Sequence, residues 1–446
     1  MSRRAHLAAA RMKVSARERV DRRDMAEPDR RRAFVWKDSW YHIRRLGLVA
    51  LCAAVTALPA ALPAALPAQQ RDTLQRRDTT RADSAQRPFV RGGVYDKPFQ
   101  TRLLGRTAIG GYAEAHARYE RTAGIAGDAG FEVKRFNLFT STRVSDHVRM
   151  AAELEFEDGA REITLEYAAI DLRIHPALTL RGGMLLSPLG RFNLSHDSPL
   201  NEFTDRPLVS TEIIGVALSE PGFGVLGQFG AGRRARVTYE LYATNGFHDG
   251  LIADAEDGTR IPLGRGNFED NNGSPAVVGR VSWSPAVGYE IGASAHHGAY
   301  NTFRDEGLRV GARRALTIGV VDFEARVLGV QLSGEAALAT INVPEGLRGI
   351  YASRQRGFYV EGLREFGRGW VRTIPGSTFA AKARLDAVDF DAGLPGDSRS
   401  QVTVGLNFRP TRDTALKLDV ARGRSRDRFN NPVEHFALLA SLATYF

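Results

Sequence analysis

Histidine is the residue type best suited to binding a metal, and His296 and His297 form the most suggestive pair in this chain. Neighbouring residues on a strand point to opposite faces of a sheet, so these two imidazoles cannot chelate one ion together. The other histidines after residue 68 lack the two-histidine spacing of zinc enzymes. They are His116, His147, His175, His196, His248 and His435. The sequence therefore predicts no metal site built on histidine.

Two further stretches carry side chains that could react or bind an ion. Residues 195–198 (SHDS) place a serine, a histidine and an aspartate side by side, whereas a catalytic triad needs groups that converge through the fold. Residues 269–272 (EDNN) offer the oxygen ligands that calcium prefers, but a solvated loop is the favoured interpretation. We therefore predict no catalytic residue, no cofactor and no enzymatic activity.

Most charged residues stand on segments in which polar and apolar side chains alternate. In the stretch RMAAELEFE, Met150 and Leu154 share one face and Glu153 and Glu155 the other, as in a half-buried strand. The same period predicts strands in residues 163–168, 236–243, 379–388, 401–410 and 416–420. In the first of these, strict alternation puts Tyr167 with the apolar side chains.

Turns and loops alternate in length between these strands. Short turns occupy residues 144–147, 175–177, 231–235, 284–288 and 409–413, and long polar loops occupy 119–130, 245–275, 299–312, 342–356 and 422–432. Short turns at one end and long loops at the other are typical of outer-membrane barrels. We predict an all-β fold for residues 106–446, a transmembrane antiparallel β-barrel of about 16 strands (16–18).

A soluble β-sandwich would show the same alternation, because one face of each of its sheets meets water. Three observations favour the barrel. The polar faces carry full charges, the strands are about ten residues or longer, and no segment after residue 68 is apolar enough to cross a membrane as a helix.

The N-terminal region reads as a leader followed by a linker. Residues 1–68 form a leader with a signal peptide: Arg44 and Arg45 precede an apolar run at 46–58, and small residues follow. We expect cleavage after Ala68, with Ala65 and Ala60 as the alternative sites. Cys52, the single cysteine, lies in this leader, so thiolate chemistry is excluded from the mature chain. Residues 69–105 are polar and read as a flexible linker.

The positive net charge is concentrated in the leader. Of 61 Lys and Arg and 51 Asp and Glu in the chain, residues 1–68 hold 14 and 6, so the remaining residues carry 47 and 45. A nearly neutral body argues against nucleic-acid binding.

The chain ends on EHFALLASLATYF, an apolar run with a terminal aromatic residue. As a strand, it puts Phe436, Leu438, Leu442 and Phe446 on one face, which we expect to contact lipid, and Tyr445 on the other. Such an ending resembles that of bacterial outer-membrane proteins, and the resemblance implies recognition by the outer-membrane assembly machinery. One departure is Thr444, where an aromatic residue is common.

The stretch RGGMLLSPLGRFNLSHDSPLNEFTDRPLVSTEIIGVAL, residues 181–218, resembles the phosphate-selective porin O and P family. The matching residues are Gly182, Pro188, Gly190, Ser198, Pro199, Phe203, Arg206, Pro207 and Gly215. The resemblance implies an outer-membrane porin, a homotrimer, that passes small hydrophilic solutes and anions such as phosphate. Phosphate-specific members line their constriction with lysines, whereas only Lys97, Lys134, Lys382 and Lys417 follow the leader here.

Selectivity in a channel comes from charged side chains at its narrowest ring. We expect the loop 187–214 to fold inward and narrow the lumen, because it is long and charged. The pore-lining candidates are Arg181, Arg191, Lys382, Arg384, Arg409, Lys417, Glu153, Glu155, Asp197, Asp205 and Arg206. The alternatives to a porin are an outer-membrane barrel enzyme, a closed structural barrel of the envelope and a soluble secreted sheet protein.

Overall fold

The computed structural model describes residues 97–98, 101–103, 106–231 and 235–446. The leader predicted at 1–68, and most of the linker predicted at 69–105, lie outside the described residues. Among the described residues, no helix is both long enough and apolar enough to cross a membrane.

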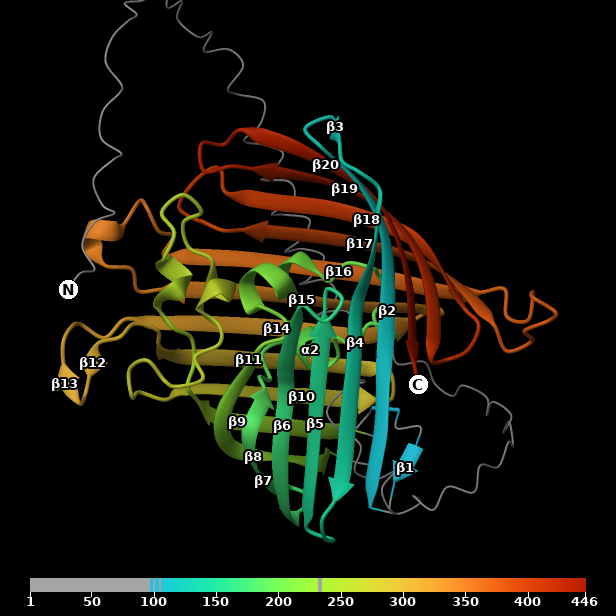
Figure 1. Ribbon diagram of the computed structural model, residues 1–446, viewed down its shortest axis with the longest axis horizontal. Coiled ribbons are helices and arrows are strands. Elements are labelled where there is room, and N and C mark those ends of the chain that lie inside the picture. The colour runs from blue at the N-terminus through green and yellow to red at the C-terminus, as the bar shows by residue number, and fades with distance from the viewer. Residues whose placement is uncertain (1–96, 99–100, 104–105, 232–234) are drawn as a thin grey trace, which may run out of the picture. The chain divides into compact units, whose positions relative to one another are not determined.

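Sixteen antiparallel strands form a closed barrel, as predicted (Figure 1). They are β2 (Thr107–Thr122), β4 (Gly130–Arg143), β5 (Val148–Glu157), β6 (Glu162–His175), β7 (Leu178–Leu186), β8 (Ser219–Ala231), β9 (Ala235–Thr244), β10 (Ala276–Ala286), β11 (Tyr289–Ala299), β14 (Ala315–Val327), β15 (Val330–Ile341), β16 (Arg354–Phe366), β17 (Thr378–Asp389), β18 (Ser398–Arg409), β19 (Thr414–Arg426) and β20 (Pro432–Tyr445). Each pairs with its neighbours along the chain, and β2 pairs with β20 to close the ring.

Short strands and helical turns lie in the connections between the barrel strands. The strands β1 (Thr101–Leu103) and β3 (Ile125–Ala126) pair with β2, and β12 (Arg304–Asp305) pairs with β13 (Leu308–Arg309). Helical turns are α2 (Arg191–Leu194), a π-helical turn at Ser210–Ile214, and 3-10 turns at Asp249–Ile252, Ile261–Gly264 and Glu345–Leu347.

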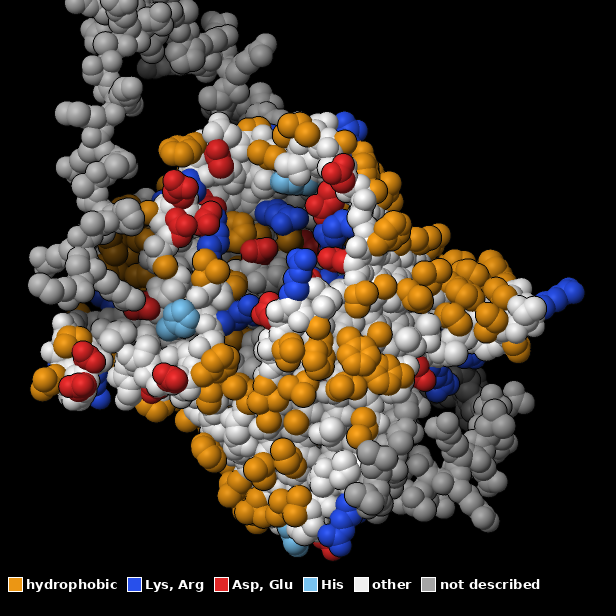
Figure 2. Space-filling view, viewed as in Figure 1, with side chains coloured by type: hydrophobic (Ala, Val, Ile, Leu, Met, Phe, Trp, Pro, Cys, Tyr) orange, Lys and Arg blue, Asp and Glu red, His pale blue; other side chains and the backbone are white. Residues whose placement is uncertain are grey.

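The strands carry their apolar side chains outward and their polar side chains inward. On β18, Val404 and Leu406 are 48% and 53% exposed, whereas Thr403 and Asn407 are buried in the interior. Figure 2 shows hydrophobic side chains spread over the outer surface of the strands and charged side chains gathered in the hollow at the barrel mouth. This distribution is the reverse of a soluble protein and matches the predicted alternation.

One predicted orientation is wrong. Tyr167 does not share a face with Leu165, because Glu166 is an extra residue in the pairing of β6 with β5: Glu153 lies opposite Tyr167, and Leu154 lies opposite Leu165. A β-bulge of this kind shifts the alternation by one residue. Glu166 and Tyr167 are therefore both buried, and the ring of Tyr167 lies in the interior.

Aromatic side chains cluster near the ends of several strands. Phe379 packs between Phe366 and Phe408, with ring centroids 5.9 and 4.9 Å away. The terminal Phe446 stacks on Phe136 at 5.5 Å, while Tyr445 points inward. Aromatic rings at this level suit the boundary between lipid and water.

A charged residue on the outer surface of a central strand should destabilise the barrel. Leu418 of β19 is 54% exposed, and we expect Leu418→Arg to lower the free energy of unfolding in lipid vesicles by about 2–4 kcal/mol, because hydrocarbon cannot solvate a guanidinium. Urea titration with electrophoretic detection of the folded barrel measures this change. Leu418→Val is the control, and Arg422→Leu, near the long-loop end of the same face, should be nearly neutral. An equally stable Leu418→Arg variant would show that water, not lipid, covers this face.

Candidate functional site

The long connection between β7 and β8, residues 187–218, folds into the barrel. Its turns depend on two glycines with positive φ: Gly190, at +77°, precedes α2, and Gly215, at +84°, ends the π-helical turn. L-amino acids with a side chain rarely adopt such angles. We call this segment the inner loop.

The second half of the inner loop is held by apolar packing. Ile213 and Ile214 are fully buried against inward-facing residues of the barrel wall, among them Ile318 of β14 and Val388 of β17. Residues of the connection 245–275 join the same core, which includes Phe247, Leu251 and Ile261. Part of the interior is therefore a packed apolar core, which the sequence analysis did not anticipate.

The first half of the inner loop is held by basic side chains of the opposite wall. The Lys417 Nζ of β19 donates to the carbonyl oxygens of Ser198 and Phe203, at 2.8 and 3.4 Å. The Arg409 guanidinium of β18 donates to the carbonyl oxygen of Pro199 at 3.0 Å. These cations thereby fix the path of the loop backbone.

Two ion pairs of the wall make further contacts with the inner loop. Lys382 of β17 pairs with Asp419 of β19, at 2.6 Å, and also donates to a loop carbonyl. Arg384 pairs with Asp386 at 2.8 Å and donates to the carbonyl oxygen of Asp205 at 2.9 Å. Each cation is shared between a wall carboxylate and the loop, which offsets the cost of burying it.

Wall carboxylates bind the N–H groups of the same loop. Asp419 accepts from the backbone N–H of Thr204 at 2.8 Å, and Asp386 accepts from that of Leu208 at 3.1 Å. Glu335 of β15 accepts from the first turn of α2. The wall therefore binds both N–H and C=O groups of a loop that, apart from two short helical turns, has no regular secondary structure to satisfy them.

Lys97, which precedes the first strand, is buried inside the barrel. Its Nζ lies 2.8 Å from Glu153 of β5 and 2.5 Å from Asp197 of the inner loop, and 5.5 and 5.9 Å from the ring centres of Phe139 and Tyr167. Burial lowers the pKa of Lys97, but the two carboxylates outweigh it and hold that pKa above its ordinary value. Lys97 thus joins the loop to the wall.

His196 lies beside Lys97 in the inner loop and is buried. Its Nδ1 is 2.8 Å from the carbonyl oxygen of Asn193, and its Nε2 is 2.8 Å from the Glu166 carboxyl. Burial, assisted by Arg206, lowers the pKa of His196 to about 4, so the ring is neutral at pH 7.

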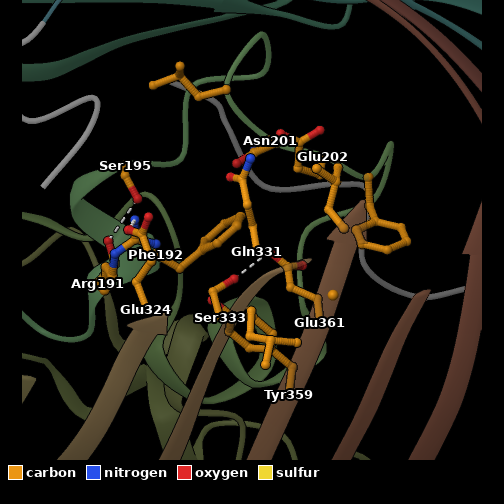
Figure 3. Close-up of a pocket in the computed structure, with 15 residues that line it drawn as sticks. Arg191, Phe192, Ser195, Asn201, Glu202, Glu324, Gln331, Ser333, Tyr359 and Glu361 are labelled. Atoms are coloured by element: carbon orange, nitrogen blue, oxygen red, sulfur yellow. Dashed lines mark hydrogen bonds and ion pairs between the residues drawn. The ribbon is translucent and has the colours of Figure 1, made fainter. Parts of the chain in front are cut away.

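A cavity of about 90 Å³ lies between the inner loop and strands β14 to β16 (Figure 3). On one side Arg191 of the loop pairs with Glu324 of β14. On the other, the Ser333 hydroxyl donates to Glu361 at 2.9 Å. Charged and aromatic side chains line this cavity together.

Most of the predicted pore-lining residues converge on the inner loop. Arg191, Asp197, Asp205 and Arg206 belong to it, Lys382, Arg384, Arg409 and Lys417 contact it, and Glu153 reaches it through Lys97. Arg181 and Glu155 instead pair within the wall, with Asp171 at 2.7 Å and with Arg135 at 3.1 Å.

Sequence reasoning missed several residues that hold the loop. Lys97 lies in the segment interpreted as a linker. The sequence distinguishes it only as one of the four lysines after the leader. Glu114 accepts from Ser198 across 84 residues, a pairing that no local pattern could indicate. Among the described residues no three His, Cys, Asp or Glu side chains converge as metal ligands, and His296 is buried while His297 is exposed.

Comparison with known proteins identifies the fold. No family model matches the chain. An uncharacterised protein of Aquifex aeolicus is 24% identical over 358 residues, which are 74% of this chain and 79% of that protein. Among solved structures, Salmonella typhi OmpF in complex with daunomycin has a TM-score of 0.51 at 11% identity, covering 78% of this chain and all of that one. The anion-selective porin of Comamonas acidovorans has a TM-score of 0.50 at 11% identity, covering 76% and 99%. The barrel therefore has the general outer-membrane porin fold, without a specific tie to the O and P family.

Removing the Lys97 ammonium should loosen the inner loop. In Lys97→Met, Glu153 and Asp197 lose a buried counter-ion, and breaking such a pair costs about 3–5 kcal/mol. We expect a lower thermal midpoint of the refolded protein. Lys134→Met is the matched control, because Lys134 pairs with Asp158 at the exposed end of β4. Equal midpoints for the two variants would contradict a role for Lys97 in holding the loop.

Acid should also loosen the loop through His196. Its folded pKa of about 4 lies below its ordinary 6.5, so the unfolded state binds the proton first and stability falls as the pH drops from about 6.5 towards 4. The loss approaches about 3 kcal/mol at pH 4. Thermal midpoints at pH 7 and pH 4.5 measure it, and His196→Asn should show a smaller drop than the wild type. An identical drop in both proteins would exclude His196 as the titrating group.

Proposed function

We propose that this protein is a porin of the bacterial outer membrane that lets small hydrophilic solutes diffuse passively through its barrel. The observation that carries the proposal is the inside-out closed barrel, whose interior holds the inner loop against charged side chains of the wall. In this proposal, loop and wall together form the charged constriction from which a channel derives selectivity. The proposal involves no cofactor and no bond-breaking step.

Anions, phosphate among them, are the solute class that we favour. Arg191, Lys382, Arg384, Arg409 and Lys417 all lie on or against the inner loop. All but Gly182 of the residues that resemble the phosphate-selective O and P family fall on this same loop, and the Comamonas acidovorans protein of similar fold is described as anion-selective.

The proposal implies three kinds of partner. Outer-membrane lipid would cover the apolar outer surface, and the assembly machinery would read the C-terminal strand that ends in Phe446. We further propose a homotrimer. An apolar groove on the outside of the barrel, lined partly by Ala117, Leu418 and Ala440, offers a surface for a neighbouring copy.

Single-channel recording tests the function directly. The refolded full chain, added to a planar lipid bilayer in KCl, should produce discrete conductance steps, and a salt gradient should give a reversal potential whose sign reports anion preference. Heat-denatured protein is the control. A folded protein that inserts into the bilayer without producing steps would reject the channel and favour a closed structural barrel.

A further inference from the structure

Arg206 of the inner loop holds a guanidinium that is only partly used. Its Nη1 donates to the carbonyl oxygen of Val216 at 3.3 Å. Its Nε and Nη2 atoms are buried and have no hydrogen-bond partner among the described residues. These two atoms form the edge of a guanidinium that binds a carboxylate or phosphate through two parallel hydrogen bonds. A buried donor pair without an acceptor is costly and needs an explanation.

Other interior arginines show how this edge is normally satisfied. Arg181 uses its Nε and Nη2 to bind both oxygens of Asp171, at 2.7 and 2.9 Å. Arg280 of β10 binds both oxygens of Asp322 on β14 through its other edge, Nη1 and Nη2. Arg206 differs, because among the described residues no carboxylate oxygen lies within 4.0 Å of it.

A second guanidinium reaches the same piece of backbone. Arg265, in the connection 245–275, donates from Nη1 to the carbonyl oxygen of Gly215 at 2.7 Å, one residue before the carbonyl that Arg206 uses. Burial and the nearby charge of Arg206 lower the pKa of Arg265. Two cations held close together in a partly buried place repel each other, and an anion between them would offset that repulsion.

Two wall carboxylates whose charges act on Arg206 contact other groups. Glu155 of β5 pairs with Arg135 at 3.1 Å, and Glu166 of β6 lies 2.8 Å from His196 Nε2. Neither is within hydrogen-bonding distance of the Nε and Nη2 atoms of Arg206, which stay open to an external acceptor.

We propose that Arg206 and Arg265 form a binding subsite for an oxyanion, the carboxylate or phosphate group of a solute that enters the barrel. The Nε and Nη2 atoms of Arg206 would bind two oxygens of the anion side by side, and Arg265 would supply the second positive charge. This inference rests on the proposed channel for its physiological meaning, but binding itself can be measured without conduction. Arg206 as a whole is only half-buried, so a rotation of its guanidinium would open the edge to an entering anion.

Calorimetric titration of the refolded full chain in detergent, with sodium phosphate and separately with sodium acetate, tests the subsite. We expect saturable heat with at least one of these ions, about tenfold weaker affinity in Arg206→Gln, and a smaller loss in Arg265→Gln. Arg206→Lys keeps the charge but not the fork, so it should bind more weakly than the wild type and more tightly than Arg206→Gln. Arg348→Gln, which removes an exposed external charge, is the matched control. Comparing the affinities for phosphate and acetate shows whether the subsite prefers a tetrahedral or a planar oxyanion.

The outcomes separate the subsite from the channel. No saturable heat in the wild type, or equal affinity in the wild type and Arg206→Gln, would overturn the subsite even if the protein conducts. Saturable binding that depends on Arg206, in a protein that gives no conductance steps, would overturn the channel and leave the subsite standing. If both hold, phosphate or acetate should reduce the KCl current of the wild type, and the reduction should need about tenfold more anion in Arg206→Gln.

Discussion

The pairing of β2 with β20 is the contact on which the rest of this structure depends. Hydrocarbon offers no partner for a backbone N–H or C=O, so a sheet can sit in a membrane only if it has no edge. The register from Tyr112 opposite Tyr445 to Thr122 opposite His435 closes the ring. Closure gives the sheet an inner and an outer face. Because side chains alternate along each strand, the apolar residues then face outward towards lipid, and the charged residues face an enclosed space.

That enclosed space is occupied by the inner loop, which two different forces hold. Apolar burial fixes the half that contains Ile213 and Ile214, and charged hydrogen bonds fix the half between Ser198 and Asp205. The wall pairs serve both polarities of the loop backbone, because Lys382 donates to it while its partner Asp419 accepts from it. Charged groups placed on a rigid barrel can therefore position an irregular segment that would not hold its shape alone.

The interior cations differ in whether all their hydrogen-bond donors have partners, and this difference bears on function. Almost every cation that contacts the loop is matched by a carboxylate or several carbonyl groups, so it positions the backbone besides adding positive charge to the interior. Arg206 is the exception among the candidates, since the edge best suited to an oxyanion has no partner among the described residues. A site that positions a solute needs such an unsatisfied group, whereas a site that only supports the fold does not.

Much of the fold followed from the sequence, because strand alternation is local. The period in residues 401–410 and the C-terminal run predicted which side chains point outward, and the length and charge of residues 187–214 predicted that this loop folds into the barrel. The inward orientation of Tyr167 did not follow from the sequence, because a bulge is set by how two strands pair and not by either strand alone. The burial of Lys97 between Glu153 and Asp197, and the open edge of Arg206, were decided only by the tertiary structure. These features depend on distances between residues far apart in the chain, and the closed barrel alone sets such distances.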